Sequence, residues 1–158
     1  TEGGKFSHNS TYVENCSSGG FLIDTSSYGT IRASHVVCNT PVDGVSTIDG
    51  AHVYITGSTI ENCSTGISVD HSTAVSDNTV IKNSTAYGVL SSSANYSGTY
   101  MTITATGGTG VSCNNGSVCR WNSSTSTITG TSNGNIYTQP PGSNSNGSVW
   151  GQSTMMIY

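Results

Sequence analysis

The sequence predicts an all-β parallel solenoid, in which the chain winds as a coil and each repeat forms one turn. The first observation is a glycine that recurs every 22 to 24 residues. Repeats of that length are typical of solenoids, where each turn contacts only its neighbours. The glycines that mark the repeat are Gly20, Gly44, Gly66, Gly88, Gly110 and Gly134.

Composition is the second observation. Serine and threonine are the most frequent residues, leucine occurs only at Leu22 and Leu90, and charged residues make up 8% of the chain. Threonine, valine, isoleucine and tyrosine favour strands, and no stretch has apolar residues at helical spacing. Since valine and isoleucine are evenly spread and prolines number only three, we expect a folded chain with a thin apolar core.

The glycine register divides the chain into about six rungs. They span residues 10–24, 31–49, 53–70, 73–91, 100–114 and 125–137. Each rung begins with a short strand, predicted at residues 12–13, 36–37, 59–60, 80–81, 102–103 and 127–128. A polar turn follows, built on Asn15, Asn39, Asn62 or Asn83, because asparagine tolerates left-handed backbone and stacked asparagines can form a ladder. The glycine then turns a corner and a second strand follows.

The remaining segments depart from the repeat. Residues 114–124 insert between two rungs, and residues 138–148 form a linker rich in proline, glycine, serine and asparagine. We therefore predict a solenoid over residues 1–137, followed by a linker and a C-terminal cap or oligomerisation tail over residues 138–158. The first rung has no evident cap, so we expect preceding protein or another subunit to cover it.

The five cysteines are an odd number, so at least one lies outside any disulfide within the chain. Cys16, Cys38 and Cys63 precede their glycines by similar intervals and are expected to stack as buried thiols. Cys113 and Cys119 are suitably spaced for a local disulfide if the protein is extracellular. No set of cysteines and histidines has zinc-ligand spacing, and no cofactor or metal is implied.

Charge excludes several function classes. The net charge is −4, with four lysines and arginines in all. Nucleic acids and anionic membranes are bound by clustered cations, so neither is an expected partner. Membrane insertion is not expected either, because no apolar run approaches the roughly 18 residues of a membrane span.

Three segments resemble the coil of a known superfamily: YVENCSSGGFLI (12–23), TIENCSTGISV (59–69) and TVIKNSTAYGVL (79–90). Their order of strand, asparagine turn and glycine-led apolar strand is similar to that of right-handed, single-stranded parallel β-helices of the pectin-lyase-like type. The resemblance covers residues 8–137. That superfamily includes polysaccharide lyases and hydrolases, bacterial adhesins, and the trimeric tailspikes and tail fibres of bacteriophages.

The serine-, threonine-, glycine- and asparagine-rich composition and the apolar tail look most like a phage tailspike or tail-fibre segment. That resemblance implies an extracellular virion protein, a homotrimer in contact with other virion proteins, and host surface polysaccharide as the ligand. A secreted or cell-surface protein is the alternative location. The calcium site and catalytic cation of the lyase members have no match here, which disfavours a lyase.

Asp24, Asp49 and Asp70 follow their glycines by four or five residues and are the candidate catalytic residues. On stacked rungs, Asp24 and Asp70 are expected ~9–10 Å apart. Inverting glycosidases hold their two carboxyl groups ~6.5–9.5 Å apart, so the spacing suits a glycan hydrolase. The plainer interpretation is that each aspartate ends a strand by bonding to the next turn.

Aromatic rings stack on the apolar face of a sugar, so Trp121, Tyr137 and Trp150 are candidate glycan-binding residues. Their alternative role is capping or subunit contact. Thr-x-Thr patterns within residues 102–106 and 125–131 are similar to the threonine ladders of ice-binding solenoids, but their registers are expected to differ.

Three functions therefore stay open. We favour a virion structural protein that binds host polysaccharide. A glycan hydrolase on the same scaffold and a passive structural unit, such as a capsid decoration or filament protein, are the alternatives.

Overall fold

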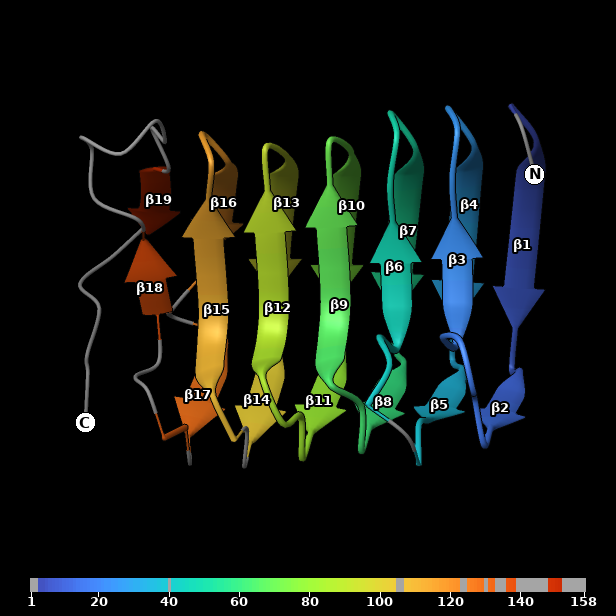
Figure 1. The fold of residues 1–158 in the computed structure, drawn as a ribbon, viewed down its shortest axis with the longest axis horizontal. Helices are drawn as coiled ribbons and strands as arrows, with labels where there is room; N and C mark the ends of the chain where they lie inside the picture. The colour runs from blue at the N-terminus through green and yellow to red at the C-terminus, as the bar shows by residue number, and fades with distance from the viewer. Residues whose placement is uncertain are drawn as a thin grey trace.

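The chain forms a parallel β-solenoid of about five turns. The computed structural model describes residues 3–39, 41–104, 107–122, 125–129, 131–132, 136–138 and 148–151. Figure 1 shows the turns stacked along the long axis, from β1, β2 and β3 at the N-terminal end. The predicted all-β parallel solenoid, with its period of about 22 residues, is confirmed.

Each of the five turns from β1 to β15 contributes one strand to each of three parallel sheets, and strands β16 to β19 continue these sheets toward the C-terminus. Sheet A contains β1 (Lys5–Asn9), β4 (Tyr28–Arg32), β7 (His52–Thr56), β10 (Thr73–Asp77), β13 (Asn95–Thr99), β16 (Val118–Trp121) and β19 (Ser148–Gly151). Sheet B contains β2 (Tyr12–Glu14), β5 (His35–Val37), β8 (Thr59–Glu61), β11 (Val80–Lys82), β14 (Thr102–Thr104) and β17 (Thr127–Thr129). Sheet C contains β3 (Phe21–Ile23), β6 (Val45–Thr47), β9 (Thr65–Asp70), β12 (Tyr87–Ser92), β15 (Thr109–Asn114) and β18 (Ile136–Thr138).

The two strands predicted for each turn are those of sheets B and C, and the sequence missed the third strand as a separate element. The core consists of columns of residues that repeat from turn to turn. In sheet B, Val36, Ile60, Ile81 and Ile103 occupy one register position and are fully buried. Because each β-branched side chain packs on its equivalent above and below, a narrow core suffices.

Left-handed residues turn the corners between sheets. The predicted asparagine turns after sheet B are confirmed at Asn15, Asn62 and Asn83, whose φ values lie between 54° and 58°. The asparagine ladder forms as two pairs. Asn39 Nδ2 donates to Asn15 Oδ1 at 2.8 Å, and Asn83 Nδ2 donates to Asn62 Oδ1 at 3.2 Å.

The predicted role of the recurring glycines is wrong. Gly66 does not turn a corner, because it lies inside β9, outside the left-handed region. A Cβ atom on Gly66 would lie 2.5 Å from Cγ2 of Ile81 and 2.6 Å from the backbone oxygen of Gly88. Gly88 is equally crowded by the following turn. The repeat therefore needs glycine for space, where sheet C approaches sheet B across the thin interior.

The structure also corrects the predicted stack of three thiols. Cys38 and Cys63 form a disulfide that joins two successive turns, with their Cα atoms 4.7 Å apart. Cys16, which is also buried, belongs to neither disulfide. Cys113 and Cys119 form the second disulfide, so the suggested local pairing is present.

Part of the predicted C-terminal tail adds to sheet A. Strand β19 pairs in parallel with β16, so residues 148–151 continue the stack. The other residues of the predicted linker and tail, from 139 to 147 and from 152 to 158, lie outside the described residues. Within the described part of the chain, no helix has the length and apolar character needed to cross a membrane.

Candidate functional site

The outer face of sheet A presents two tyrosines side by side. Residues alternate between core and solvent along each strand, so every second side chain of β1, β4 and β7 faces outward. We call these nine side chains the sheet A platform. Its members are Lys5, Ser7, Asn9, Tyr28, Thr30, Arg32, His52, Tyr54 and Thr56.

Tyr28 and Tyr54 form the aromatic centre of the platform. Their side chains are 44% and 47% exposed, and their ring centroids are 6.4 Å apart with the planes tilted by 50°. The rings come from adjacent turns, because Tyr28 is paired with His52 and Tyr54 with Thr30. Parallel pairing thus fixes two large, partly solvated aromatic surfaces on one flat face.

Polar side chains surround the two rings. Thr30 Oγ1 donates to Ser7 Oγ at 3.0 Å on the exposed surface. Lys5 is paired with Tyr28, while Arg32 follows Thr30 by two residues on the same outer face. The platform therefore combines aromatic rings with hydroxyl groups and cations.

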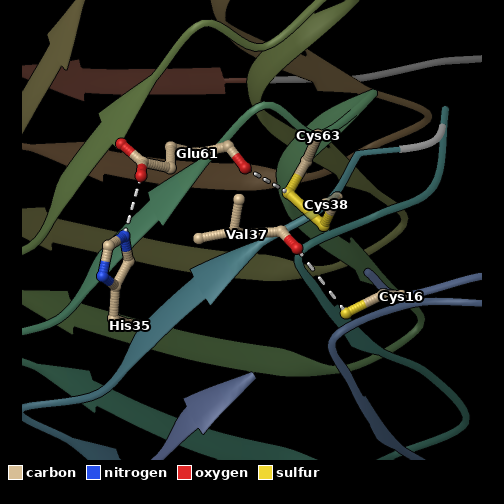
Figure 2. The surroundings of a disulfide bond; sticks show 6 residues. All are labelled: Cys16, His35, Val37, Cys38, Glu61 and Cys63. Carbon is tan, nitrogen blue, oxygen red and sulfur yellow. Dashed lines mark hydrogen bonds and ion pairs between the residues drawn. A yellow bond between two sulfur atoms is a disulfide. The ribbon is translucent and has the colours of Figure 1, made fainter. Parts of the chain in front are cut away.

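Sheet B carries a second outward-facing group of side chains, but its members satisfy one another. Glu61 accepts from Nε2 of His35 at 2.9 Å and lies 3.7 Å from the Lys82 ammonium group. Figure 2 shows His35 and Glu61 pointing toward each other across adjacent strands. Because both carboxylate oxygens already face a partner, this group offers less to an external ligand than the platform does.

Tyr12 extends the sheet B group at its N-terminal end. Its ring packs edge-on against His35, with centroids 5.2 Å apart. Its hydroxyl donates to Glu14 Oε2 at 3.1 Å, and this hydrogen bond, with the charge of Glu14, raises the pKa of the Tyr12 phenol.

Only two of the three candidate catalytic aspartates share a register position. Ile23 pairs with Thr47 and Thr47 with Val69, so the residues that follow are Asp24, Ile48 and Asp70. Asp24 and Asp70 thus lie two strands apart, a separation of ~9–10 Å. Asp49 comes one residue later, at a left-handed corner with φ of 53°.

Local contacts fit the interpretation that these aspartates end their strands by bonding to the next turn. Oδ1 of Asp70 lies 3.0 Å from Nδ1 of the adjacent His71, and the Asp24 backbone oxygen accepts from Ser27 in the following turn. Asp24 and Asp70 share a register position two strands apart, while Asp49 lies one position later.

Of the three candidate glycan-binding residues, the structure describes only the side chain of Trp121. Trp121 is 4% exposed and packs in the core, so its ring has no face free for a sugar. Tyr137 lies in β18 and Trp150 in β19, but their side chains lie outside the described residues. Sequence reasoning missed Tyr28, and the signal was available as alternating outward residues in YGTIR.

The threonine patterns share a register, contrary to the expectation from sequence. Thr102 pairs with Thr127 and Thr104 with Thr129, with all four side chains on the outer face of sheet B. On the preceding turn the equivalent positions hold Val80 and Lys82. The described threonine array therefore spans two turns.

Asp43 is a partly buried carboxyl that sequence reasoning did not single out. Burial raises the pKa of this carboxyl, and hydrogen bonds with Thr65 and Ser68 oppose part of that effect.

A cavity of about 340 Å³ lies beside the Cys38–Cys63 disulfide and is lined by uncharged residues. Among the described residues, no three His, Cys, Asp or Glu side chains come together to hold a metal ion.

We expect Asp43→Asn to gain stability relative to the native protein as pH rises. A carboxyl whose folded-state pKa exceeds its unfolded value, about 3.9, stabilises the fold below that value. This contribution is lost as pH rises through the folded-state pKa. Asparagine at this position does not titrate. Melting temperatures at pH 3 and pH 7 test this, and a variant-minus-native difference that is the same at both pH values would contradict it.

Comparison with known proteins adds no relative. No protein-family model, curated protein or solved structure matches this chain. The function is therefore proposed from the chain's own surface and from the resemblance of its sequence repeat.

Proposed function

We propose that this chain is a virion structural protein of the tailspike or tail-fibre kind, which binds host cell-surface polysaccharide through the sheet A platform. The observation that carries the binding proposal is the exposed Tyr28–Tyr54 pair on a flat, rigid sheet. The assignment to a virion follows from the sequence resemblance.

A polysaccharide suits the chemistry of this surface better than an apolar partner does. A pyranose offers an apolar face to an aromatic ring and hydroxyl groups at its edge. On the platform, Tyr28 and Tyr54 supply the rings, while Ser7 and Thr30 supply hydroxyl groups. Obligate protein interfaces are more apolar than this mixture, so a sugar chain is the occupant we favour.

Two further features support an extracellular, oligomeric particle. Disulfides persist in oxidising compartments, and two are present here. In the described chain, β1, β2 and β3 are edge strands of their sheets, and edges of this kind are usually covered. The resemblance implies a homotrimer, and light scattering on the purified chain measures its mass directly.

Replacing both platform tyrosines with alanine is expected to weaken polysaccharide binding about tenfold or more. Each ring contact contributes about 0.5–1.5 kcal/mol, and about 1.4 kcal/mol corresponds to a tenfold change in affinity. Calorimetry against purified host surface polysaccharide tests Tyr28→Ala/Tyr54→Ala. Both side chains are exposed, so the variant should fold as the native chain does.

Tyr12→Ala is the matched control, because Tyr12 is 59% exposed but lies on sheet B. It should bind polysaccharide like the native protein. Equal losses of affinity in the two variants would show that the platform is not the polysaccharide-binding site. A native chain that binds none of the host polysaccharides would instead favour a passive structural unit.

The shared register of Asp24 and Asp70 favours glycan hydrolysis as a second candidate function. Their separation of ~9–10 Å lies near the upper end of the ~6.5–9.5 Å range of inverting glycosidases. If the protein cleaves the polysaccharide it binds, release of reducing ends should disappear in Asp24→Asn/Asp70→Asn. Cleavage that persists in this variant would eliminate the two aspartates as catalytic residues.

A further inference from the structure

The cations of this protein are concentrated on one face. Only four lysines and arginines occur in a chain of net charge −4. Lys5, Arg32 and Arg120 all project from the outer face of sheet A and are exposed. Lys82 projects from sheet B, where it lies close to Glu61. The described outer face of sheet A therefore carries three cations and one acidic residue, Asp77, on a protein that is acidic as a whole.

Two of these cations border the tyrosines. Lys5 is paired with Tyr28 on the neighbouring strand. Arg32 is paired with Thr56, and Tyr54 lies two residues before Thr56. Neighbouring strands lie ~4.8 Å apart, so a ligand stacked on the rings would have a lysine on one side and an arginine on the other.

The two bordering cations are available for a ligand. Among the described residues, no ion pair involves Lys5 or Arg32. The acidic residue that shares a register position with Arg32 is Asp77, which lies two strands away, or ~9–10 Å. The described ion pairs include none between these two side chains.

We propose that the ligand of the sheet A platform is an anionic polysaccharide, whose rings stack on Tyr28 and Tyr54 while its acidic groups pair with Arg32 and Lys5. This inference rests on the proposed function and specifies its ligand. The planar guanidinium of Arg32 suits a carboxylate, because it donates two parallel hydrogen bonds. Since the whole protein is acidic, a polyanion would be repelled elsewhere and directed to this face.

The test compares one polymer in two charge states. Hyaluronate and its carboxyl-reduced form share a backbone but differ in the carboxylate, and calorimetry with the full chain measures both. We expect about tenfold tighter binding of hyaluronate, a preference that shrinks as salt rises. Arg32→Gln should remove most of this preference, because it should weaken the binding of hyaluronate more than that of the carboxyl-reduced polymer. Lys82→Gln, on sheet B, is the matched control and should keep the preference.

Each other outcome has a distinct meaning. Equal binding of the two polymers overturns the anionic ligand and leaves polysaccharide binding standing. A preference that survives Arg32→Gln overturns the assignment to this face. Single-stranded DNA that binds as tightly as hyaluronate overturns a sugar-specific site, since stacked rings and cations also suit nucleic acid. A native chain that binds neither polymer overturns this inference, while the proposed function is tested separately by binding of the host polysaccharides.

Discussion

Gly66→Ala is expected to destabilise the solenoid by about 3 kcal/mol, the upper end of the range for overpacked cores. The added Cβ would lie 2.5 Å from Cγ2 of Ile81 and 2.6 Å from the backbone oxygen of Gly88. The isoleucine can change rotamer, but the oxygen belongs to a strand held on both sides by parallel pairing. Relief therefore requires two turns to move apart, and urea unfolding measures the cost.

Gly57→Asn is the matched control for this substitution. Gly57 has a φ of 60°, and an added Cβ would meet only the Ala33 nitrogen, at 3.9 Å. Asn78 occupies the equivalent corner on the next turn with a φ of 48°, so asparagine suits this backbone. The control should lie within about 0.5 kcal/mol of the native chain. If Gly66→Ala unfolds no more easily than Gly57→Asn, the close approach of sheets B and C is not what requires the glycine.

A double-mutant cycle separates the two clashes. Ile81→Ala alone should cost about 2–5 kcal/mol, because it opens a cavity in the central column. Combined with Gly66→Ala it removes the side-chain clash but leaves the one with the Gly88 oxygen. We expect the double variant to be more stable by about 1 kcal/mol than the sum of the two single costs predicts. This coupling is smaller than the cost of Gly66→Ala alone, because the clash with the backbone oxygen remains.

The period of the repeat could be predicted from sequence because one sterically demanding position recurs in each turn. The glycines and the apolar residues around them identify sheets B and C. Sheet A was not predicted because the residues at its inward positions differ in size from turn to turn. Equivalent residues on successive turns are Gly29, Val53, Ala74, Tyr96 and Cys119. Residues of such different size still fill one column, since a large side chain such as Tyr96 adjoins a small one such as Ala74.

Which sheets could be recognised from sequence also explains which candidate-site residues could be predicted. Asp24 and Asp70 each lie one residue before a left-handed corner at the end of an identifiable strand, so their alignment could be predicted. Asp49 lies one position later and occupies the left-handed corner itself. Trp121 lies in sheet A, and without that sheet its inward direction could not be read from sequence. Tyr28 was missed for the same reason, because it is not near a repeat glycine.

Removing the Cys38–Cys63 disulfide with paired alanine substitutions is expected to lower the free energy of unfolding by about 3 kcal/mol. The bond closes a loop of 25 residues, which is a full turn of the solenoid. In the unfolded chain it keeps two turns near each other, and in the folded chain both sulfur atoms are buried. Guanidinium unfolding of Cys38→Ala/Cys63→Ala measures the loss.

Cys113→Ala/Cys119→Ala is the internal comparison, because that disulfide spans only six residues and joins β15 to β16. Loop-closure entropy grows with the logarithm of loop length, so its removal should cost about 2 kcal/mol. Both variants lose the same atoms from buried positions, which leaves loop length as the main difference between them. Equal losses would mean that lost packing, and not restraint of the unfolded chain, is how these bonds stabilise the solenoid. A larger loss at Cys38 and Cys63 would mean that restraint of the unfolded chain is the main contribution, because this disulfide closes a loop of 25 residues and the other a loop of six.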